Sequence, residues 1–225
     1  MSNLYLNLGD YKGESLNVYG GGCEKVNLIT GMKGGGKSHI TKGIISEGIL
    51  SNMSAAVFDI NNEYDQLPNV LPLKPGENLK FRLDYMESET FVRMMDRLNP
   101  SFGQTATAPI AYAKLPGIIK ARKDAKHIPD MEFLRKASAQ VITGNSPPEK
   151  NMQYAYERAI EVIESSHLIM SEAEARAEDN FIRERMKGHS IPFPEIISIR
   201  SAFNNMFAGQ PQVLTFQIGD RKSVV

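Results

Sequence analysis

Cysteine is almost absent from this sequence: Cys23 is the only one among 225 residues. A single thiol excludes an internal disulfide and a thiolate metal site, and the four scattered histidines show no metal-ligand spacing, so we predict no structural metal. Long apolar runs are also missing, because no stretch approaches the ~20 residues that span a bilayer. The N-terminus has no basic region followed by an apolar run, so we predict no signal peptide, and the cytoplasm is the simplest location.

Charge of one sign is lacking as well, since 26 Lys and Arg residues balance 26 Asp and Glu residues. The chain as a whole therefore does not attract nucleic acid, and a polyanion would have to meet a local basic patch or a ring of several copies. One basic cluster could contact DNA phosphates or a partner, or form a solvated face: Lys114, Lys120, Arg122, Lys123, Lys126 and His127.

A glycine-rich loop is the strongest signal in the sequence. Residues 28–38 read LITGMKGGGKS, and residues 31–38 match the whole pattern GxxxxGK[ST]. The loop follows an apolar run at residues 26–30, predicted to be a buried parallel strand, and precedes a helix predicted over residues 37–50. This context predicts a Walker A phosphate loop that binds a nucleoside triphosphate, namely ATP with Mg²⁺.

The chemistry of a phosphate loop assigns a role to each residue type. Consecutive glycines let the backbone amides face one phosphate, and the helix N-terminus adds its dipole. Lys37 would neutralise the β- and γ-phosphates, and the Ser38 hydroxyl would bind Mg²⁺. Lys33 could contact phosphate, although a solvated lysine is the alternative interpretation. We assign nucleotide binding to these residues: Gly31, Lys33, Gly34, Gly35, Gly36, Lys37, Ser38 and His39.

A second motif follows, because residues 57–64 read VFDINNEY. The predicted strand at residues 55–59 ends at Asp59, the edge of a parallel sheet where ligands bind. Together with the phosphate loop, this pattern resembles the HerA/FtsK superfamily of DNA-pumping ATPases, whose HerA-like members have D-x-x-x-E-Y here. The resemblance implies that Asp59 faces Mg²⁺ and the γ-phosphate, and that Glu63 and Tyr64 line the nucleotide or a subunit contact.

From this resemblance we predict catalytic roles for Lys37, Asp59 and Glu63, and Mg²⁺ binding by Ser38 and Asp59. The alternatives are structural: Asp59 would cap a turn at the strand end, and Glu63 and Tyr64 would support the loop.

The predicted fold is α/β, with a P-loop NTPase parallel sheet core and an inserted helical bundle. Residues 1–87 would form the first part of the core, residues 88–207 the helical insertion, and residues 208–225 the return to the sheet. A further strand is predicted at residues 79–83, and strand-like sequence returns at residues 212–218. Helices are predicted near residues 91–98, from Pro129, over residues 152–163, after Ser171 with its capping box to Glu174, and from Pro194.

Hydrolysis needs a Walker B aspartate and a carboxylate that orients the attacking water, and no apolar run ending in Asp-Glu is present. We therefore expect this chain to be the N-terminal half of a HerA-like ATPase and to bind triphosphate weakly, with negligible turnover.

Three functions remain open from the sequence. The first is a motor ATPase that works as a homo-oligomeric, hexameric ring and couples ATP hydrolysis to DNA translocation or packaging. The second is a small-molecule or nucleotide kinase, in which Asp59 would hold the acceptor and the helical region would form a lid. The third is a nucleotide-binding scaffold that does not hydrolyse ATP.

Overall fold

The computed structural model describes residues 5–19, 28–87, 90, 93–94, 117, 120–121, 124, 126–141, 146–208 and 211–217. The chain forms two compact units. The first combines residues 1–74 with residues 202–225, and the second contains residues 75–201. The division predicted at residues 87/88 and 207/208 stays a prediction.

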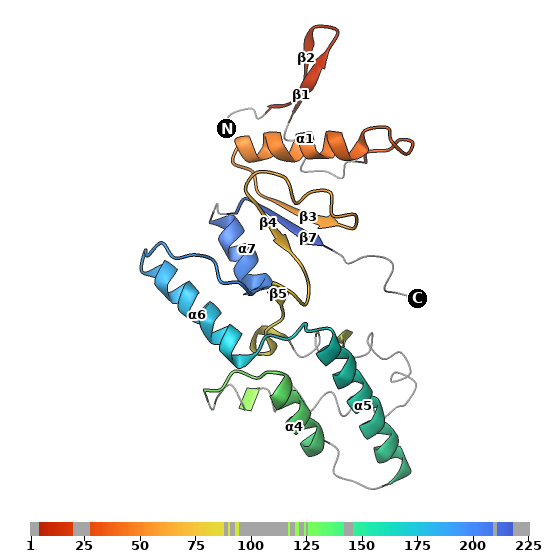
Figure 1. Ribbon diagram of the computed structural model, residues 1–225, viewed down its shortest axis with the longest axis vertical. Helices are drawn as coiled ribbons and strands as arrows, with labels where there is room; N and C mark the ends of the chain where they lie inside the picture. The colour runs from red at the N-terminus through yellow and green to blue at the C-terminus, as the bar shows by residue number, and fades with distance from the viewer. Residues whose placement is uncertain are drawn as a thin grey trace. The chain divides into compact units, whose positions relative to one another are not determined.

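A three-stranded parallel sheet forms the core of the first unit (Figure 1). Its order is β3 (Ala55–Asp59), β7 (Val213–Gln217) and β4 (Val70–Leu73), so the strand that comes last in sequence lies in the middle. All five residues of β7 are buried, as expected of a central parallel strand. The strands predicted at residues 55–59 and 212–218 are confirmed as far as Gln217; Ile218 lies outside the described residues. The sequence VLPL of β4 was not predicted as a strand, and its proline is tolerated because β4 is an edge strand.

Helices lie on either side of this sheet, as Figure 1 shows. The helix α1 (Lys37–Leu50) confirms the predicted helix after the glycine-rich loop. The helix α7 (Ile199–Phe207) places Phe203 against Phe216 of β7, with ring centroids 5.9 Å apart. The prediction that a helix starts at Pro194 is wrong, because residues 197–198 pair with another strand and the helix begins only at Ile199.

The N-terminal residues form an antiparallel hairpin of β1 (Tyr5–Tyr11) and β2 (Glu14–Tyr19). Lys12 and Gly13 both have positive φ, as a two-residue type I′ turn requires. The strand predicted at residues 26–30 is wrong for residues 28–30, which belong to no strand, and Leu28 is 85% exposed. Residues 26–27 lie outside the described residues. An apolar run forms a strand only where a neighbouring strand supplies hydrogen bonds, and none of the described strands pairs with residues 28–30.

The second unit joins a short parallel pair, β5 (Leu79–Lys80) with β6 (Ile197–Ser198), to the 3₁₀ helix η2 (Leu83–Tyr85) and to α-helices, three of which the structure describes in full. The strand predicted at residues 79–83 is therefore shorter than expected. The described α-helices are α4 (Met131–Val141), α5 (Pro147–Ser165) and α6 (Glu172–Met186). Its largest fully buried side chains are Leu83, Leu134, Tyr156, Ile163 and Met170. The helices predicted from Pro129, over residues 152–163 and after Ser171 are confirmed, whereas most of residues 91–98 lie outside the described residues.

Local capping explains where two of these helices begin. In α6, Ser171 Oγ accepts a hydrogen bond from Glu174 N, and a Glu174 carboxylate oxygen accepts one from Ser171 N at 2.8 Å, so the predicted capping box is confirmed. Ser146 and Glu149 form the same motif at α5. Pro147 and Pro148 follow this cap in the first turn of α5, where prolines are tolerated.

A buried ion network surrounds Arg82 in the second unit. Its guanidinium donates to Asp84 of η2 and to Glu178 and Asp179 of α6, with N–O distances between 2.5 and 3.4 Å. Burial opposes the charged form, but hydrogen bonds to Asp84 and Asp179 hold the pKa of Arg82 above its ordinary value. Glu178, which has no exposed surface, also accepts from Ser198 N at 2.6 Å. Arg82 thus connects η2 with α6, and Glu178 extends the network to β6.

Gly76 provides a direct test of the packing in the second unit. Its φ is +83°, and a Cβ there would lie 2.4 Å from the backbone oxygen of Ser166. We expect Gly76→Ala to lower the free energy of unfolding by several kcal/mol, because a backbone clash adds to the ~1–2 kcal/mol cost of the left-handed conformation. Gly188→Ala is the matched control, since Gly188 has φ +82° and open space around it. Urea unfolding midpoints compare the two variants, and equal losses would contradict the close approach.

Candidate nucleotide-binding site

The glycine-rich loop is folded around the side chain of Lys37. Its ammonium group donates to the backbone oxygens of Gly31 at 3.0 Å and Met32 at 2.7 Å, and Gly35 N donates to Met32 O at 3.1 Å. The loop therefore closes on itself over seven residues. Because its hydrogen bonds are local, this shape is encoded in the loop sequence.

Glycine is required at three consecutive positions for separate reasons. Gly34 and Gly36 have φ values of +79° and +80°, which other residues adopt only with strain. A Cβ on Gly35 would lie 3.1 Å from Met32 O, tighter than ordinary van der Waals contact. The run of three glycines thus lets the backbone turn sharply into α1.

The start of α1 offers unused hydrogen-bond donors. Gly36 is its N-cap residue, and Gly36 O accepts from Ile40 N at 3.0 Å. Within the part of the chain that the structure describes, no partner is found for the amides of Lys37, Ser38 and His39. The first turn contains no acidic side chain that could compete for them. Such a helix start suits an anion, because free N–H groups and the helix dipole both favour negative charge.

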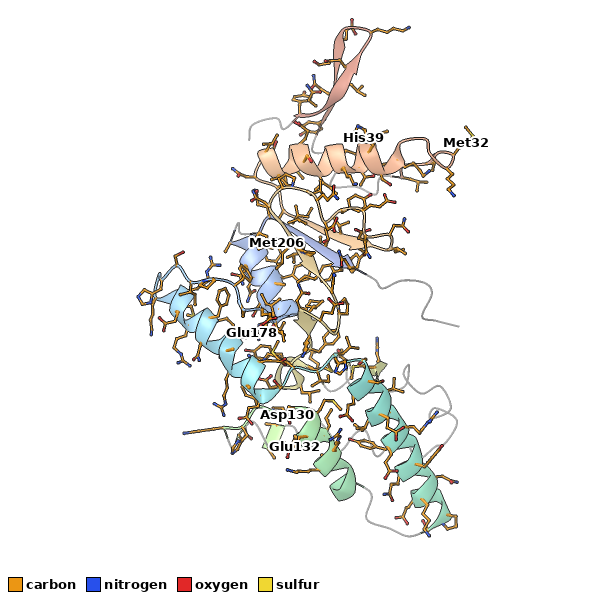
Figure 2. All side chains as sticks on the ribbon, in the orientation of Figure 1. Met32, His39, Asp130, Glu132, Glu178 and Met206 are labelled. Atoms are coloured by element: carbon orange, nitrogen blue, oxygen red, sulfur yellow. The ribbon has the colours of Figure 1, made fainter. Side chains whose placement is uncertain are left out.

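The side chains of the loop and first turn differ in exposure. Figure 2 shows Met32 at the outer end of the loop, away from α1, and His39 on the helix itself. Gly31, Lys33 and His39 are exposed, whereas Lys37 and Ser38 are half-buried. The donor set suits a nucleotide with Mg²⁺: backbone amides and an ammonium group are donors for phosphate oxygens, and the Ser38 hydroxyl lies one residue beyond the lysine.

Asp59 lies at the carboxyl end of β3 and is only 2% exposed. Its Oδ1 accepts from Asn61 N at 3.2 Å, and its Oδ2 accepts from Tyr64 N at 2.9 Å. The carboxylate therefore caps the turn that follows the strand, which matches the structural alternative. These hydrogen bonds also explain the spacing between Asp59 and Tyr64, because they fix the turn that contains Glu63. Tyr64 lies near α1, with Lys42 Nζ 5.6 Å from its ring centroid.

The two motifs lie at the same end of the sheet. Gln212, just before β7, donates to Ile49 O near the carboxyl end of α1 at 3.3 Å. The helix therefore runs opposite to β7, and its N-terminus lies beside the carboxyl ends of β7 and β3, as Figure 1 shows. The structure thus brings Asp59 and Glu63 to the loop side of the sheet. Sequence reasoning missed two buried polar residues there, Thr215 and Gln217, although they alternate with apolar residues in QVLTFQI.

The family model described as "Helicase HerA, central domain" matches residues 15–208. The chain belongs to this HerA family. The match includes the glycine-rich loop, the Asp59 motif and the described helices α4, α5 and α6, so the predicted relationship to HerA-like P-loop ATPases is confirmed. The α/β fold with parallel strands is confirmed as well.

Comparison with solved structures found the bacterial conjugative coupling protein TrwBdeltaN70, in its trigonal form in complex with sulphate. The TM-score is 0.43 at 13% sequence identity, and the match covers 83% of this chain and 45% of that chain. This HerA-family chain therefore matches less than half of the TrwBdeltaN70 structure. No curated protein matches the sequence.

Other predicted features are only partly described. Of the basic cluster, Lys120, Lys126 and His127 lie in the described residues and are exposed, and His127 Nδ1 is 3.7 Å from Glu172. Lys114, Arg122 and Lys123 lie outside the described residues. None of the described helices is long and apolar enough to span a membrane.

Proposed function

We propose that this HerA-family chain binds ATP with Mg²⁺ at residues 31–39 and serves as the nucleotide-binding part of a ring-shaped motor that moves DNA. The observation that carries the proposal is the loop closed on Lys37 at a helix start with unpartnered amides. The family assignment supports the motor class.

Different groups of the site would bind different parts of the nucleotide and its Mg²⁺. The amides of Lys37, Ser38 and His39 would donate to phosphate oxygens, and the Lys37 ammonium group would exchange its two carbonyl partners for the phosphates. The Ser38 hydroxyl is the Mg²⁺ ligand that we propose. Mg²⁺ would neutralise charge on the phosphates when bound.

Asp59 and Glu63 have proposed roles at the same edge of the sheet. Both oxygens of Asp59 accept from backbone amides, yet each carboxylate oxygen has a second lone pair, so a water-mediated contact with Mg²⁺ stays compatible with the geometry. Glu63, half-buried in the turn that Asp59 holds, is proposed to face the nucleotide or a neighbouring subunit.

The proposal is tested by product analysis with ring and DNA assays on the protein. We expect this chain to bind ATP in the presence of Mg²⁺ and to assemble into rings by analytical ultracentrifugation, with negligible phosphate release because no apolar run ending in Asp-Glu is present. A longer form of the protein that supplies these carboxylates should release free phosphate, and duplex DNA should accelerate that release. A phosphorylated small-molecule acceptor would instead indicate a kinase. A monomeric longer form whose turnover does not respond to DNA would contradict the motor function. Nucleotide binding without phosphate release by that longer form would indicate the scaffold function instead.

A further inference from the structure

The central strand β7 carries two polar side chains into the interior of the first unit. Thr215 has no exposed surface and Gln217 is 7% exposed. They alternate with Phe216, whose ring packs against Phe203 of α7. Because neighbouring residues of a strand point to opposite faces, Thr215 and Gln217 face away from α7.

The same face carries Asp59, which lies directly opposite Gln217 in the parallel register of β3 and β7. Phe58 and Phe216, the preceding pair, stack at 5.2 Å on the α7 side. Tyr64 connects Asp59 to α1. The Asp59 carboxylate accepts a hydrogen bond from Tyr64 N, and the Tyr64 ring lies near Lys42 of α1. Gln217 therefore ends its strand on the α1 face of the sheet, next to the aspartate of the second motif.

The polar side chains on this face differ in how many hydrogen bonds they form. Asp59 accepts two backbone amides, whereas Thr215 Oγ1 is fully buried with no partner among the described residues. No hydrogen bond joins the carboxamide of Gln217, which is 7% exposed, to another described residue. Buried polar groups are nearly always paired, so the unpaired Thr215 hydroxyl indicates that this face lacks a polar partner among the described residues. A carboxamide supplies two donors and one acceptor, which suits phosphate oxygens or the water beside them.

The lengths of β7 and α1 place Gln217 at the same edge of the sheet as the phosphate loop. Gln212 meets Ile49 O at the amino end of β7. From there, the strand rises about 17 Å to Gln217, and α1 runs about 18 Å in the same direction from Ile49 back to Lys37. The two lengths are similar, so Gln217 and the start of α1 both lie toward the carboxyl edge of the sheet, as Figure 1 shows for α1 and β7.

We infer that Gln217 hydrogen-bonds the terminal phosphoryl end of the bound nucleotide and thereby distinguishes a triphosphate from a diphosphate. This inference rests on the proposed nucleotide site and adds to it a specificity residue on another strand. Lys37 and the loop amides hold the phosphate chain of either nucleotide, whereas a side chain from β7 reaches the site from the sheet side. Removing the Gln217 side chain should therefore weaken the binding of the triphosphate and leave the binding of the diphosphate unchanged.

The test compares Gln217→Leu, at the carboxyl end of β7, with Gln212→Leu, just before its first residue. Binding of a non-hydrolysable ATP analogue and of ADP is measured by isothermal titration calorimetry on the whole chain with Mg²⁺. We expect Gln217→Leu to weaken the analogue by about 10- to 100-fold, the loss typical of a hydrogen bond to a charged group, and to change ADP affinity less than twofold. Gln212→Leu should leave the ratio of the two affinities unchanged.

Gln217→Glu is the second variant, because it keeps the size of the side chain and places a negative charge near the terminal phosphate. It should weaken the analogue at least as much as Gln217→Leu, and it stays informative if the leucine variant does not fold. Equal losses for both nucleotides, or no loss for either, would overturn the role of Gln217 while Lys37→Ala still abolishes binding. If the unaltered chain binds neither nucleotide, the proposed function fails, and the inference fails with it.

Discussion

Replacing Lys37 with alanine should abolish the stabilisation of this HerA-family chain by ATP. A ligand present at 100 times its dissociation constant stabilises a protein by about 2.7 kcal/mol, and this increment should disappear in Lys37→Ala. The physical reason is twofold. The variant removes the positive charge that we propose to face the phosphates, and it removes both hydrogen bonds that close the loop, to Gly31 O and Met32 O.

The measurement is the shift of the thermal midpoint with increasing ATP and Mg²⁺. Lys42→Ala is the matched control, because it removes a lysine from the same helix whose ammonium group lies near Tyr64 instead of the loop. The control should keep most of the ATP shift. An undiminished shift in Lys37→Ala would rule out the assigned phosphate contact, whatever other site bound the nucleotide.

Arg82→Met should destabilise the second unit by about 3–5 kcal/mol, the cost of leaving buried carboxylates without their cation. Glu178 is fully buried and Asp84 is 5% exposed, so water cannot replace the guanidinium there. Tyr85 adds to the effect, since its ring lies 4.1 Å from the Arg82 Cζ and 4.9 Å from the Arg200 Cζ. Burial, as the largest cause, raises the pKa of the Tyr85 hydroxyl, so the ring stays neutral between the two cations at physiological pH.

Arg176→Met is the comparison for Arg82→Met, because Arg176 forms an exposed i,i+4 pair with Glu172 on the same helix, α6. Surface pairs of this kind contribute less than about 1 kcal/mol. Urea unfolding of both variants measures the difference. Adding Glu178→Gln to Arg82→Met should recover part of the loss, since it removes one of the unpaired charges; equal effects of the two arginine substitutions would show that the buried network does not stabilise the fold.

The local parts of this protein were predictable because their interactions are local. Lys37 bonds to residues five and six positions earlier, and the capping box of α6 joins residues three positions apart. The helix α1 and the strand β3 follow from apolar patterns next to the glycine-rich loop. Family membership followed from the same short segments, since the loop and the Asp59 motif carry its specific signals.

The sequence misled where an element depends on a distant partner. The apolar residues 28–30 pair with no described strand, and residues 197–198, predicted as helix, pair with Leu79 and Lys80 across more than a hundred residues of sequence. The edge strand β4 was not predicted, because its sequence contains a proline. Strand pairing is a long-range property, so an apolar pattern shows that a segment is able to form a strand but not which neighbour accepts it.

The sequence by itself determined the phosphate loop, its following helix and the family, because glycines, a lysine and a helix start act within a few residues of one another. Only the tertiary structure decided that β7 lies between β3 and β4, that Gln217 faces Asp59, and that Arg82 is enclosed by carboxylates from α6. These arrangements join residues about 100 to 160 positions apart, and they form because buried polar groups and strand edges must find partners wherever the folded chain supplies them.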